Sequence, residues 1–418
     1  MNEQIKQRIT QLNNGEVPNG YEKTEIGTFP VGWKTTTLDK LLEFKNGVNA
    51  DKEKYNSGGK MISVMDILSD SPIYYDKIKG QVDIDEKTLD TYSVTYGDIL
   101  FQRSSETFED AGKSNVYLDK DRTATYSGFV IRGKKKADYN PYFLNEALRI
   151  GQVRNQIIRN AAGSQHINVG QDSLAKIIVP LASDAEQSKI AEILMKWDEA
   201  IELREKHIAA LESKKEAILQ RLVVKNDGWK KVKLKDILIE RSIFATKEDG
   251  YPHVTLSKAG VNKKTDRYNR DFLVKSDDKK YKITYPNDIC YNPANLKFGV
   301  ICVNKFPEEA IFSPIYVTYE VSEMYNVDFI GAILCSNNFI NYIRKYEEGT
   351  VYERQAVKSE DFLRGEIWVP SSKAEQDRIA DVIHKINDYV DLVQQELETL
   401  QLQRKTLQQY LLNGIVRV

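Results

Sequence analysis

The chain has 418 residues, of which 41% are hydrophobic and 29% charged, and its 60 lysines and arginines nearly balance 61 aspartates and glutamates. This composition predicts a soluble globular protein of two to four domains, and three cysteines without paired spacing favour the reducing cytoplasm over a disulfide framework. We expect neither secretion nor a membrane span, and the net charge of −1 by itself disfavours nucleic acid as a partner.

An internal repeat organises the chain. A Gly-Trp-Lys motif at 32–34 returns at 228–230, and a strand-like run follows each copy. Further motifs recur at offsets of 186 to 190: Gly97-Asp98-Ile99-Leu100 with Asn287-Asp288-Ile289-Cys290, Phe143-Leu144 with Phe329-Ile330, Gly163 with Gly349, and Val179-Pro180 with Val369-Pro370. The drift of the offset indicates insertions and deletions in the loops of a common scaffold.

A long heptad helix follows each Val-Pro pair, beginning near Ala185-Glu186-Gln187 and Ala374-Glu375-Gln376. Apolar residues recur every 3.5 residues, which is typical of a coiled-coil seam and predicts helices roughly 60 Å long. Lys215 and Arg404 place a cation at the same seam position, where we expect it to fix the register. The predicted seam residues, related by an offset of 189, are Ile190, Leu194, Trp197, Ile201, Ile208, Leu211, Ile218 and Leu222, and then Ile379, Ile383, Ile386, Val390, Val393, Leu397, Leu400, Leu407 and Leu411.

The repeat predicts five segments. They are an N-terminal helical segment (1–20), a first mixed domain (21–183), a first spacer helix (184–224), a second mixed domain (225–372), and a second spacer helix with a tail (373–418). The helices carry net charges of −2 and −1 and the mixed domains 0 and +2, with cationic runs at 132–136 and 263–270. Because the acidity gathers on the helices, nucleic acid stays open as a partner of the mixed domains.

Each mixed domain combines short alternating runs with one helical stretch. Strands are predicted at 35–42, 60–67, 94–101, 115–118, 231–238, 282–285 and 310–320, and helices at 142–160 and 328–346. This pattern predicts an α+β fold with mostly antiparallel strands, in which two mixed domains are separated by two long antiparallel helices and related by a pseudo-two-fold repeat.

Catalytic and cofactor motifs are weak in this sequence. Gly112-Lys113-Ser114 resembles the end of a phosphate-binding loop, but the first glycine of that motif is replaced by Thr107. Asn292-Pro293-Ala294-Asn295 is more typical of a turn after a strand than of a methyltransferase loop. The four histidines lack metal-ligand spacing, so we expect no metal site. Because no catalytic motif is present either, we expect no catalytic site and a role in binding and scaffolding.

The order of these motifs, given twice, resembles the DNA-specificity subunit of type I restriction-modification systems. The most specific element runs from Val179 to Ala191, ahead of the first heptad helix, and its second copy runs from Val369 to Ala380. The second copy departs slightly at Arg378, Asp381 and His384, which leaves the implied fold unchanged. The resemblance covers nearly the whole chain.

The resemblance implies two target recognition domains, each reading one half of a split, asymmetric sequence in double-stranded DNA. It also implies two methyltransferase subunits bound along the helices and two ATP-dependent translocase-nuclease subunits. This chain would then be non-catalytic and hold no cofactor, while S-adenosylmethionine, ATP and magnesium would belong to its partners.

Candidate DNA-contact residues follow the framework strands or lie in the Gly163 and Gly349 loops. Arginine pairs with guanine and glutamine with adenine, whereas serine and lysine suit phosphates. The candidates are Gln102, Arg103, Ser104, Lys113, Ser164, Gln165 and His166 in the first domain, and Asn292, Asn295, Lys297, Tyr352, Arg354 and Gln355 in the second.

Other repeated residues have predicted structural roles. Asp98 and Asp288 are expected to cap turns before buried strands, and Trp33 and Trp229 to anchor cores. Glu186 and Gln187, with their copies Glu375 and Gln376, are expected either in the first helical turn, favoured by the helix dipole, or in contact with partners.

Three other functions stay open from the sequence. An adaptor would show no preference among DNA sequences. A stand-alone regulator would bind one sequence tightly without partners. An enzyme with its site in the mixed domains would catalyse turnover of a substrate as the isolated chain. The bases read and the gap between half-sites do not follow from the sequence.

Overall fold

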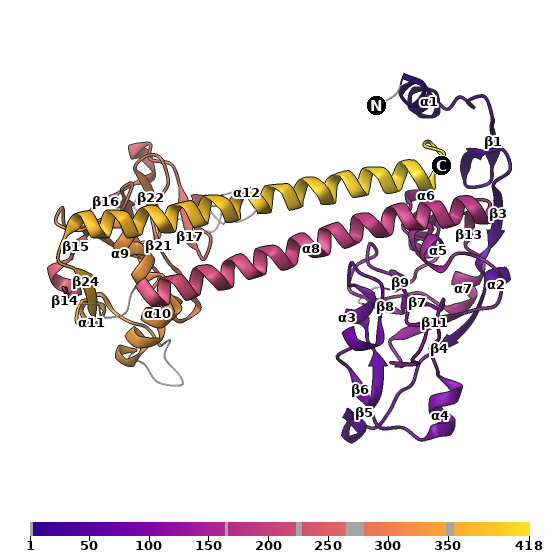
Figure 1. The fold of residues 1–418 in the computed structure, drawn as a ribbon, viewed down its shortest axis with the longest axis horizontal. Helices are drawn as coiled ribbons and strands as arrows, with labels where there is room; N and C mark the ends of the chain where they lie inside the picture. The colour runs from indigo at the N-terminus through magenta and orange to yellow at the C-terminus, as the bar shows by residue number, and fades with distance from the viewer. Residues whose placement is uncertain (1–2, 164–165, 223–227, 265–279, 348–354) are drawn as a thin grey trace. The chain divides into compact units, whose positions relative to one another are not determined.

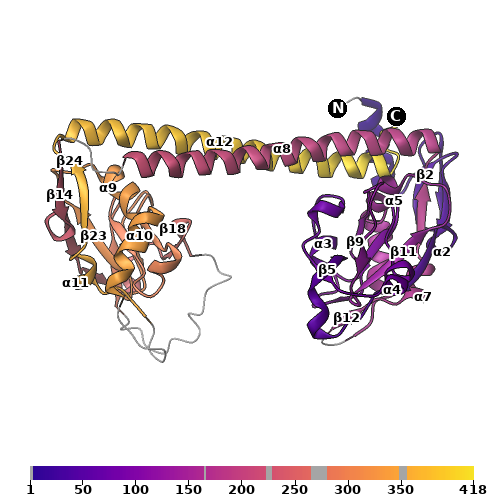
Figure 2. The same ribbon diagram turned by 60° about the horizontal axis from the view of Figure 1, so that its bottom comes forward.

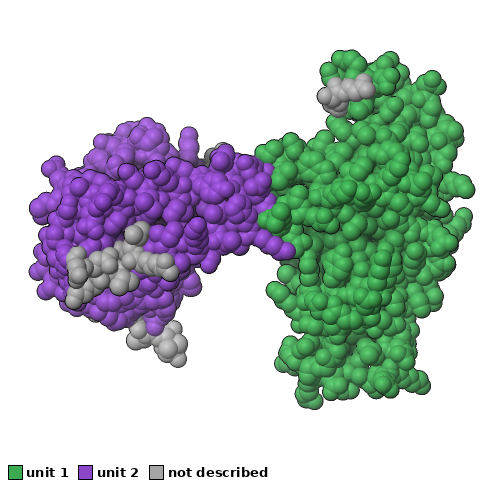
Figure 3. Space-filling view, viewed as in Figure 1, with its two compact units in different colours: residues 1–203, 397–418 green, residues 204–396 purple. Residues whose placement is uncertain are grey.

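The computed structural model describes residues 3–163, 166–222, 228–264, 280–347 and 355–418 (Figure 1). The chain forms two compact units, of which unit 1 comprises residues 1–203 and 397–418 and unit 2 comprises residues 204–396 (Figure 3). Each unit therefore contains one mixed domain together with parts of both long helices. None of the described helices is long and apolar enough to cross a membrane.

Unit 1 is built around the four-stranded antiparallel sheet β4-β11-β7-β9. Smaller sheets β10-β5-β6, β12-β8, β13-β3 and β1-β2 surround it. Its strands are β1 (Tyr21–Thr24), β2 (Gly27–Pro30), β3 (Lys34–Thr37), β4 (Leu42–Asn46), β5 (Tyr55–Ile62), β6 (Gln81–Val82), β7 (Ile99–Gln102), β8 (Ser104–Ser105), β9 (Ser114–Val116), β10 (Thr125–Tyr126), β11 (Val130–Lys135), β12 (Ile167–Asn168) and β13 (Ile178–Leu181).

Four short helices of unit 1, α2 (Leu38–Leu41), α3 (Val64–Ile67), α5 (Pro141–Ala147) and α7 (Gln171–Ala175), pack against strands of the β4-β11-β7-β9 sheet. The other helices of the domain are α1 (Glu3–Asn13), α4 (Glu86–Thr91) and α6 (Gly151–Arg159), with short 3-10 turns at Lys52–Lys54 and Tyr75–Lys77. The core joins Trp33, Phe101 and Phe143 to Leu194 of the first long helix and Leu411 of the second. Burial of this shared apolar surface holds the helices against the sheet.

Unit 2 repeats the plan with the antiparallel sheet β15-β23-β20-β21, whose strands correspond in order to β4-β11-β7-β9. Its strands are β14 (Trp229–Lys233), β15 (Leu238–Arg241), β16 (Phe244–Ala245), β17 (Val254–Ser257), β18 (Gly260–Lys263), β19 (Tyr281–Thr284), β20 (Ile289–Tyr291), β21 (Ile301–Val303), β22 (Ala310–Phe312), β23 (Val317–Val321) and β24 (Glu366–Pro370). Its helices are α9 (Val327–Leu334), α10 (Asn337–Ile343) and α11 (Ser359–Phe362), with 3-10 turns at Leu234–Asp236, Lys247–Asp249, Leu296–Phe298 and Arg344–Tyr346.

The long helices are α8 (Asp184–Leu222) and α12 (Lys373–Leu412). In unit 1 the start of α8 lies beside the end of α12, where Asp198 pairs with Arg404 (Figure 2). In unit 2 Leu219, near the end of α8, shares a core with Ile379 and Ile383, near the start of α12. Closer to the middle of the helices, Arg204 pairs with Glu396 at 3.1 Å. Both pairs run in the antiparallel sense. The predicted seam residues are buried or half-buried throughout, except that the Leu222 side chain lies outside the described part of the structure.

The predicted mixture of helix and sheet is confirmed. Three of the predicted runs, however, are each divided into two elements in the structure. The run 310–320 is two strands, β22 and β23, which belong to different sheets. The stretch 142–160 is two helices, because α5 ends before Arg149 and α6 starts after Ile150. The run 60–67 is the end of strand β5 followed by α3, whose first turn is held by a capping box between Ser63 and Asp66.

Candidate nucleic-acid interface

A tryptophan and a glutamate join the Gly-Trp-Lys segment of each domain to its long helix. Trp33 Nε1 donates to Glu186 Oε2 at 2.9 Å in unit 1, and Trp229 Nε1 donates to Glu375 Oε1 at 3.2 Å in unit 2. Both tryptophans are buried, as predicted. The two Gly-Trp-Lys motifs therefore belong to the same contact as the two Glu-Gln motifs.

The glutamine of each Glu-Gln motif braces a second helix. Gln187 Oε1 accepts from Asn140 N at 2.9 Å, and Gln376 Oε1 accepts from Asn326 N at the same distance. Asn140 and Asn326 are the N-caps of α5 and α9, so the glutamine fixes where those helices begin. Both glutamines are only 2% exposed, so their side chains point into the unit. This burial disfavours the alternative role predicted for them, contact with partner proteins.

Asp98 and Asp288 hold the turn that precedes the central strand of each sheet. Asp98 Oδ2 accepts from Thr95 N at 3.0 Å and Asp288 Oδ2 accepts from Tyr285 N at 2.8 Å, which confirms the predicted turn caps. Burial raises the pKa of both carboxyls, that of Asp288 to about 6. These aspartates thus set the start of β7 and β20 and lie below the surface.

Three predicted contact residues of unit 1, Gln102, Arg103 and Ser104, lie where the end of β7 pairs with the start of β11. Arg103 follows β7, and its backbone carbonyl accepts from Val169 N at 3.0 Å, which ties it to the Gly163 loop. Ser104 pairs with Asn168 in the β8-β12 ladder, and its hydroxyl donates to the Asn168 side chain. His166 is exposed in the same loop. We call this region, together with its copy in unit 2, the strand-end surface.

Unit 2 repeats this loop contact with different side chains. Pro293, which corresponds to Arg103, accepts through its carbonyl from Val357 N at 3.2 Å. Asn295 and Gln355 are exposed near this contact. The Asn292 to Asn295 segment is a turn, as predicted, in which Asn295 N donates to Asn292 O at 3.0 Å. The scaffold of the strand-end surface is therefore shared, whereas its exposed chemistry is not.

Two predicted contact residues are buried beneath this surface. Gln102 is 6% exposed and donates through Nε2 to Ser104 O at 2.9 Å, and Asn292 is 8% exposed and accepts from Ala294 N at 3.1 Å. Both amides hold the backbone of the turn that follows the strand. This placement favours a positioning role over direct contact with a ligand.

The predicted lysines of the strand-end surface each lie beside a carboxylate. Lys113 Nζ is 2.6 Å from Asp110 Oδ1, and hydrogen bonding to Lys113 and then to Thr107 lowers the pKa of Asp110. Lys297 Nζ is 3.7 Å from a carboxylate oxygen of Glu347. These pairs reduce the net positive charge that the surface offers to phosphates.

Some residues with a role in the site were missed from the sequence. Arg154 of α6 donates to the carbonyls of Glu109, Ala111 and Gly112 at 2.8 to 3.1 Å, so it braces the loop between β7 and β9. Arg154 is distant in sequence from that loop, and no motif marks it. Asn168 was also missed, although its position after Ile167 in an alternating run was a signal.

The cationic residues of β11 lie away from this surface. Within the cationic run 132–136, Arg132 is 5% exposed and donates to Ser93 O, and the run extends along β11 away from the strand-end surface. Ser164, Gln165, Tyr352 and Arg354 lie outside the described residues, as do Arg267 and Arg270.

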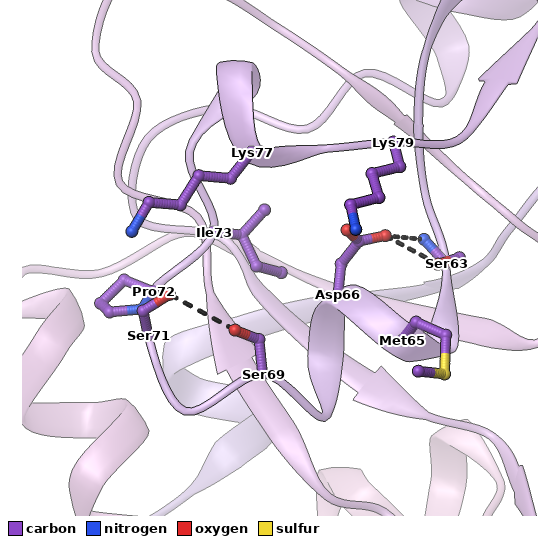
Figure 4. Close-up of a pocket in the computed structure, with 9 residues that line it drawn as sticks. All are labelled: Ser63, Met65, Asp66, Ser69, Ser71, Pro72, Ile73, Lys77 and Lys79. Carbon is purple, nitrogen blue, oxygen red and sulfur yellow. Dashed lines mark hydrogen bonds between the residues drawn. The ribbon is translucent and has the colours of Figure 1, made fainter. Parts of the chain in front are cut away.

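A separate pocket of about 420 Å³ lies in unit 1 (Figure 4). It is lined by Ser63, Met65, Asp66, Ser69, Ser71, Pro72, Ile73, Lys77 and Lys79. The Asp66 carboxylate accepts from the backbone and hydroxyl of Ser63, both at 2.7 Å, which occupies it in capping α3. No cluster of His, Cys, Asp and Glu in the described residues could hold a metal ion.

Comparisons with known proteins agree with the repeated architecture. A family model, "Type I restriction modification DNA specificity domain", matches residues 30–213. The chain is 25% identical to the putative type I restriction enzyme MjaX specificity subunit of Methanocaldococcus jannaschii, over 95% of this chain and 97% of that protein.

Two solved structures share the fold. The S subunit of a type I restriction-modification system from M. genitalium matches with a TM-score of 0.53 at 14% identity, over 95% of this chain and 97% of that one. A chain from a structure of type I R-M complex assembly and conformational transition matches with a TM-score of 0.57 at 13% identity, over 93% and 98%. The chain is therefore similar to the specificity subunits of type I restriction-modification systems, through one family-model match and one relative aligned along nearly its whole length.

Proposed function

We propose that this chain reads a bipartite, asymmetric sequence in double-stranded DNA, with one strand-end surface for each half. DNA-sequence recognition is the role of the type I specificity domain, and specificity subunits are non-catalytic, with the catalytic activities in other subunits. The observation that carries the bipartite reading is the repeated loop contact, Val169 N to Arg103 O and Val357 N to Pro293 O, on which different side chains are displayed. One scaffold with two chemistries suits two unlike half-sites.

The residues proposed for direct contact are the exposed or half-buried ones on the strand-end surface. The Arg103 guanidinium donates one long hydrogen bond, of 3.4 Å, to Gly128 O. Because this bond is weak, we propose that the guanidinium pairs with a guanine when DNA is bound. Ser104, Lys113 and His166 complete the proposed set in unit 1, and Asn295, Lys297 and Gln355 form that of unit 2. Ser164, Gln165, Tyr352 and Arg354 stay proposed contacts from the sequence.

The proposed partners are two methyltransferase subunits and two ATP-dependent translocase-nuclease subunits. The two-fold number is supported by the repeat, because each unit offers one copy of the same framework to one copy of a partner. S-adenosylmethionine, ATP and magnesium would serve those partners. Reading genomic DNA would place the complex in the cytoplasm.

The test is to express the chain with its methyltransferase subunits in a methylation-free host and to map methylated adenines. A motif of two short defined halves with an undefined gap is expected, and Arg103→Ala should relax one position in one half by about 1 to 3 kcal/mol. A complex that methylates no defined sequence would overturn the proposal. Specific binding by the chain alone would indicate a regulator, and turnover by the chain alone an enzyme.

A second test concerns the long helices as the determinant of the gap. Insertion of seven residues after Glu205 of α8 and after Gln394 of α12 keeps the heptad seam in register. Each insertion adds about 10 Å of helix, so the gap should grow by about three base pairs while both halves stay the same. The control is the same insertion in one helix, which breaks the register. An unchanged gap would contradict this role.

A further inference from the structure

One large apolar side chain is exposed at the strand-end surface of each unit. Phe129 precedes β11 and is 65% exposed, and Ile315 precedes β23 and is 61% exposed. Single exposed apolar residues are ordinary on protein surfaces, so exposure by itself has little meaning. The positions of the two residues in their sheets are more informative.

Strand pairing places both residues at the same position in the two sheets. Phe101 of β7 pairs with Ile131, and Tyr291 of β20 pairs with Val317. Phe129 and Ile315 each lie two residues before the paired residue, although the local sequences, Ser-Gly-Phe and Ser-Pro-Ile, share only the serine. An exposed apolar residue therefore recurs where the surrounding side chains have changed.

The backbone at both positions is held in the same tight turn. Val130 N donates to Ser127 O at 2.9 Å in unit 1, and Tyr316 N donates to Ser313 O at 3.1 Å in unit 2. A β carbon at Gly128 would lie 1.8 Å from Asn49 Oδ1, so the Asn49 side chain would have to move, and Pro314 restricts φ at the matching position. A side chain on such a turn loses little backbone freedom on binding.

The turn in unit 1 is also tied to a proposed contact residue. Arg103 N donates to Phe129 O at 2.9 Å, and the Arg103 guanidinium reaches Gly128 O at 3.4 Å. A second exposed pair lies in the neighbouring loops, where Phe108 is 44% exposed and Phe298 is 59% exposed. The strand-end surface thus presents apolar groups beside polar ones in both units.

We propose that Phe129 and Ile315 each read a thymine by contact with its C5-methyl group in the major groove. This inference rests on the proposed function. Phenylalanine and isoleucine share neither a hydrogen-bonding group nor a ring, so apolar bulk is the chemistry they have in common. The thymine methyl is the apolar group that base edges present in the major groove.

The test uses the complex with methyltransferase subunits and the DNA motif mapped for it. Phe129→Ala should relax one thymine position in one half-site and Ile315→Ala one in the other half. Phe129→Leu, which keeps apolar bulk, should retain the wild-type motif. Val31→Ala and Ile239→Ala remove side chains that are 59% and 57% exposed away from this surface, and they are the matched controls.

Deoxyuridine probes then test the methyl group directly. Replacing the assigned thymine by deoxyuridine should weaken wild-type binding about fourfold, as expected for the loss of one buried methyl, and should not weaken Phe129→Ala binding further. Half-sites without a deoxyuridine-sensitive thymine would overturn the inference and leave the proposed function standing. The same holds if the variants lose affinity equally for the thymine and deoxyuridine probes, as expected for a side chain that intercalates between bases. A wild-type complex without any preferred sequence overturns the proposed function with it.

Discussion

The two units share a scaffold but differ in how a cation is held at the helix seam. In unit 1 Arg404 of α12 is 2.7 Å from Glu146 of α5 and 2.8 Å from Asp198 of α8, and Tyr142 Oη accepts from it at 3.0 Å. The arginine side chain is 11% exposed and that of Glu146 is 1% exposed. Unit 1 thus joins three helices through a buried charge cluster.

Unit 2 has Lys215 at the matching seam position. Its side chain is 28% exposed and lies 3.9 Å from Glu212 of the same helix. The repeat offsets place Ala332 and Asn387 where unit 1 has Glu146 and Asp198. The scaffold therefore forms with or without the cluster. What both units keep is the tryptophan-glutamate pair and the glutamine that braces an N-cap, and these contacts define the shared fold.

Removal of the seam cation should give the largest difference in stability between the two units. Arg404→Met removes the cation between Asp198 and Glu146, of which Glu146 keeps a salt bridge to Arg149 at 3.2 Å, and should lower the local unfolding free energy of unit 1 by about 3 to 5 kcal/mol. Lys215→Met removes a half-exposed charge with one distant partner and should change unit 2 by about 1 kcal/mol or less. Hydrogen exchange of the α5 and α9 amides measures the two effects separately.

A variant that copies unit 2 provides the control. The triple change Arg404→Lys, Glu146→Ala and Asp198→Asn removes both carboxylates that face the arginine, so most of the loss seen in Arg404→Met should be recovered. Equal losses for Arg404→Met and Lys215→Met would show that the charge cluster does not distinguish the units.

The turn aspartates offer a pH-dependent comparison. Burial raises the Asp288 pKa from 3.8 to about 6, because the carboxylate is 2% exposed and Arg241, at 3.5 Å, compensates only in part. A raised pKa means that the folded state holds the proton more tightly, so this stability is present below the unfolded pKa and is lost as pH rises through about 6.

Asp288→Asn removes this titration. Relative to that variant, unit 2 of the wild type should lose about 2 kcal/mol between roughly pH 4.5 and 7.5, measured by hydrogen exchange of the β20 amides. Asp98→Asn is the matched variant, since the pKa of Asp98 is also raised by burial. A wild type that gains stability over this range relative to Asp288→Asn would contradict the assignment.

The long helices and the repeat could be predicted because their signals are local. A 3.5-residue period and a constant offset depend only on nearby residues, and both helices begin within a turn of where the Glu-Gln motifs place them. The strands were less predictable. Alternation in 310–320 predicts extended chain, but it does not show that β22 and β23 pair in different sheets.

The site could be predicted in outline and not in detail. Candidates were predicted both after the central strand and in the Gly163 loop, and the structure joins these two segments through the bond from Val169 N to Arg103 O. Whether a side chain there is buried depends on tertiary packing, which is why Gln102 and Asn292 looked like contacts from the sequence. The partners of Glu186 and Gln187 are Trp33 and Asn140, which lie too far away in sequence for any local pattern to reveal.

The glutamine braces should show equal effects in the two units. Gln187→Met and Gln376→Met remove the acceptor for the backbone N–H groups of Asn140 and Asn326 and leave those groups part-buried and unpaired. Each should cost about 1 to 2 kcal/mol in the unfolding of α5 or α9, since methionine retains the volume and the loss is mainly hydrogen bonding. Hydrogen-exchange rates that differ severalfold between the two variants would show that the glutamine stabilises α5 and α9 to different extents.

The smallest expected difference concerns the residue before each turn aspartate. Gly97 has φ of +92° and Asn287 has φ of +70°, so both copies need a left-handed residue, which asparagine tolerates better than other side chains. Asn287→Gly should change the unfolding free energy by about 0.5 kcal/mol or less, because relief of strain offsets lost chain entropy. Gly97→Asn should cost about 1 kcal/mol or more, because its β carbon would lie 2.9 Å from Lys135 Cδ and 3.2 Å from Pro141 Cγ. Denaturant midpoints of the two single variants test this asymmetry. If glycine and asparagine exchanged at equal cost, the close approach of β11 and α5 to the Gly97 turn would not be the reason that unit 1 carries glycine.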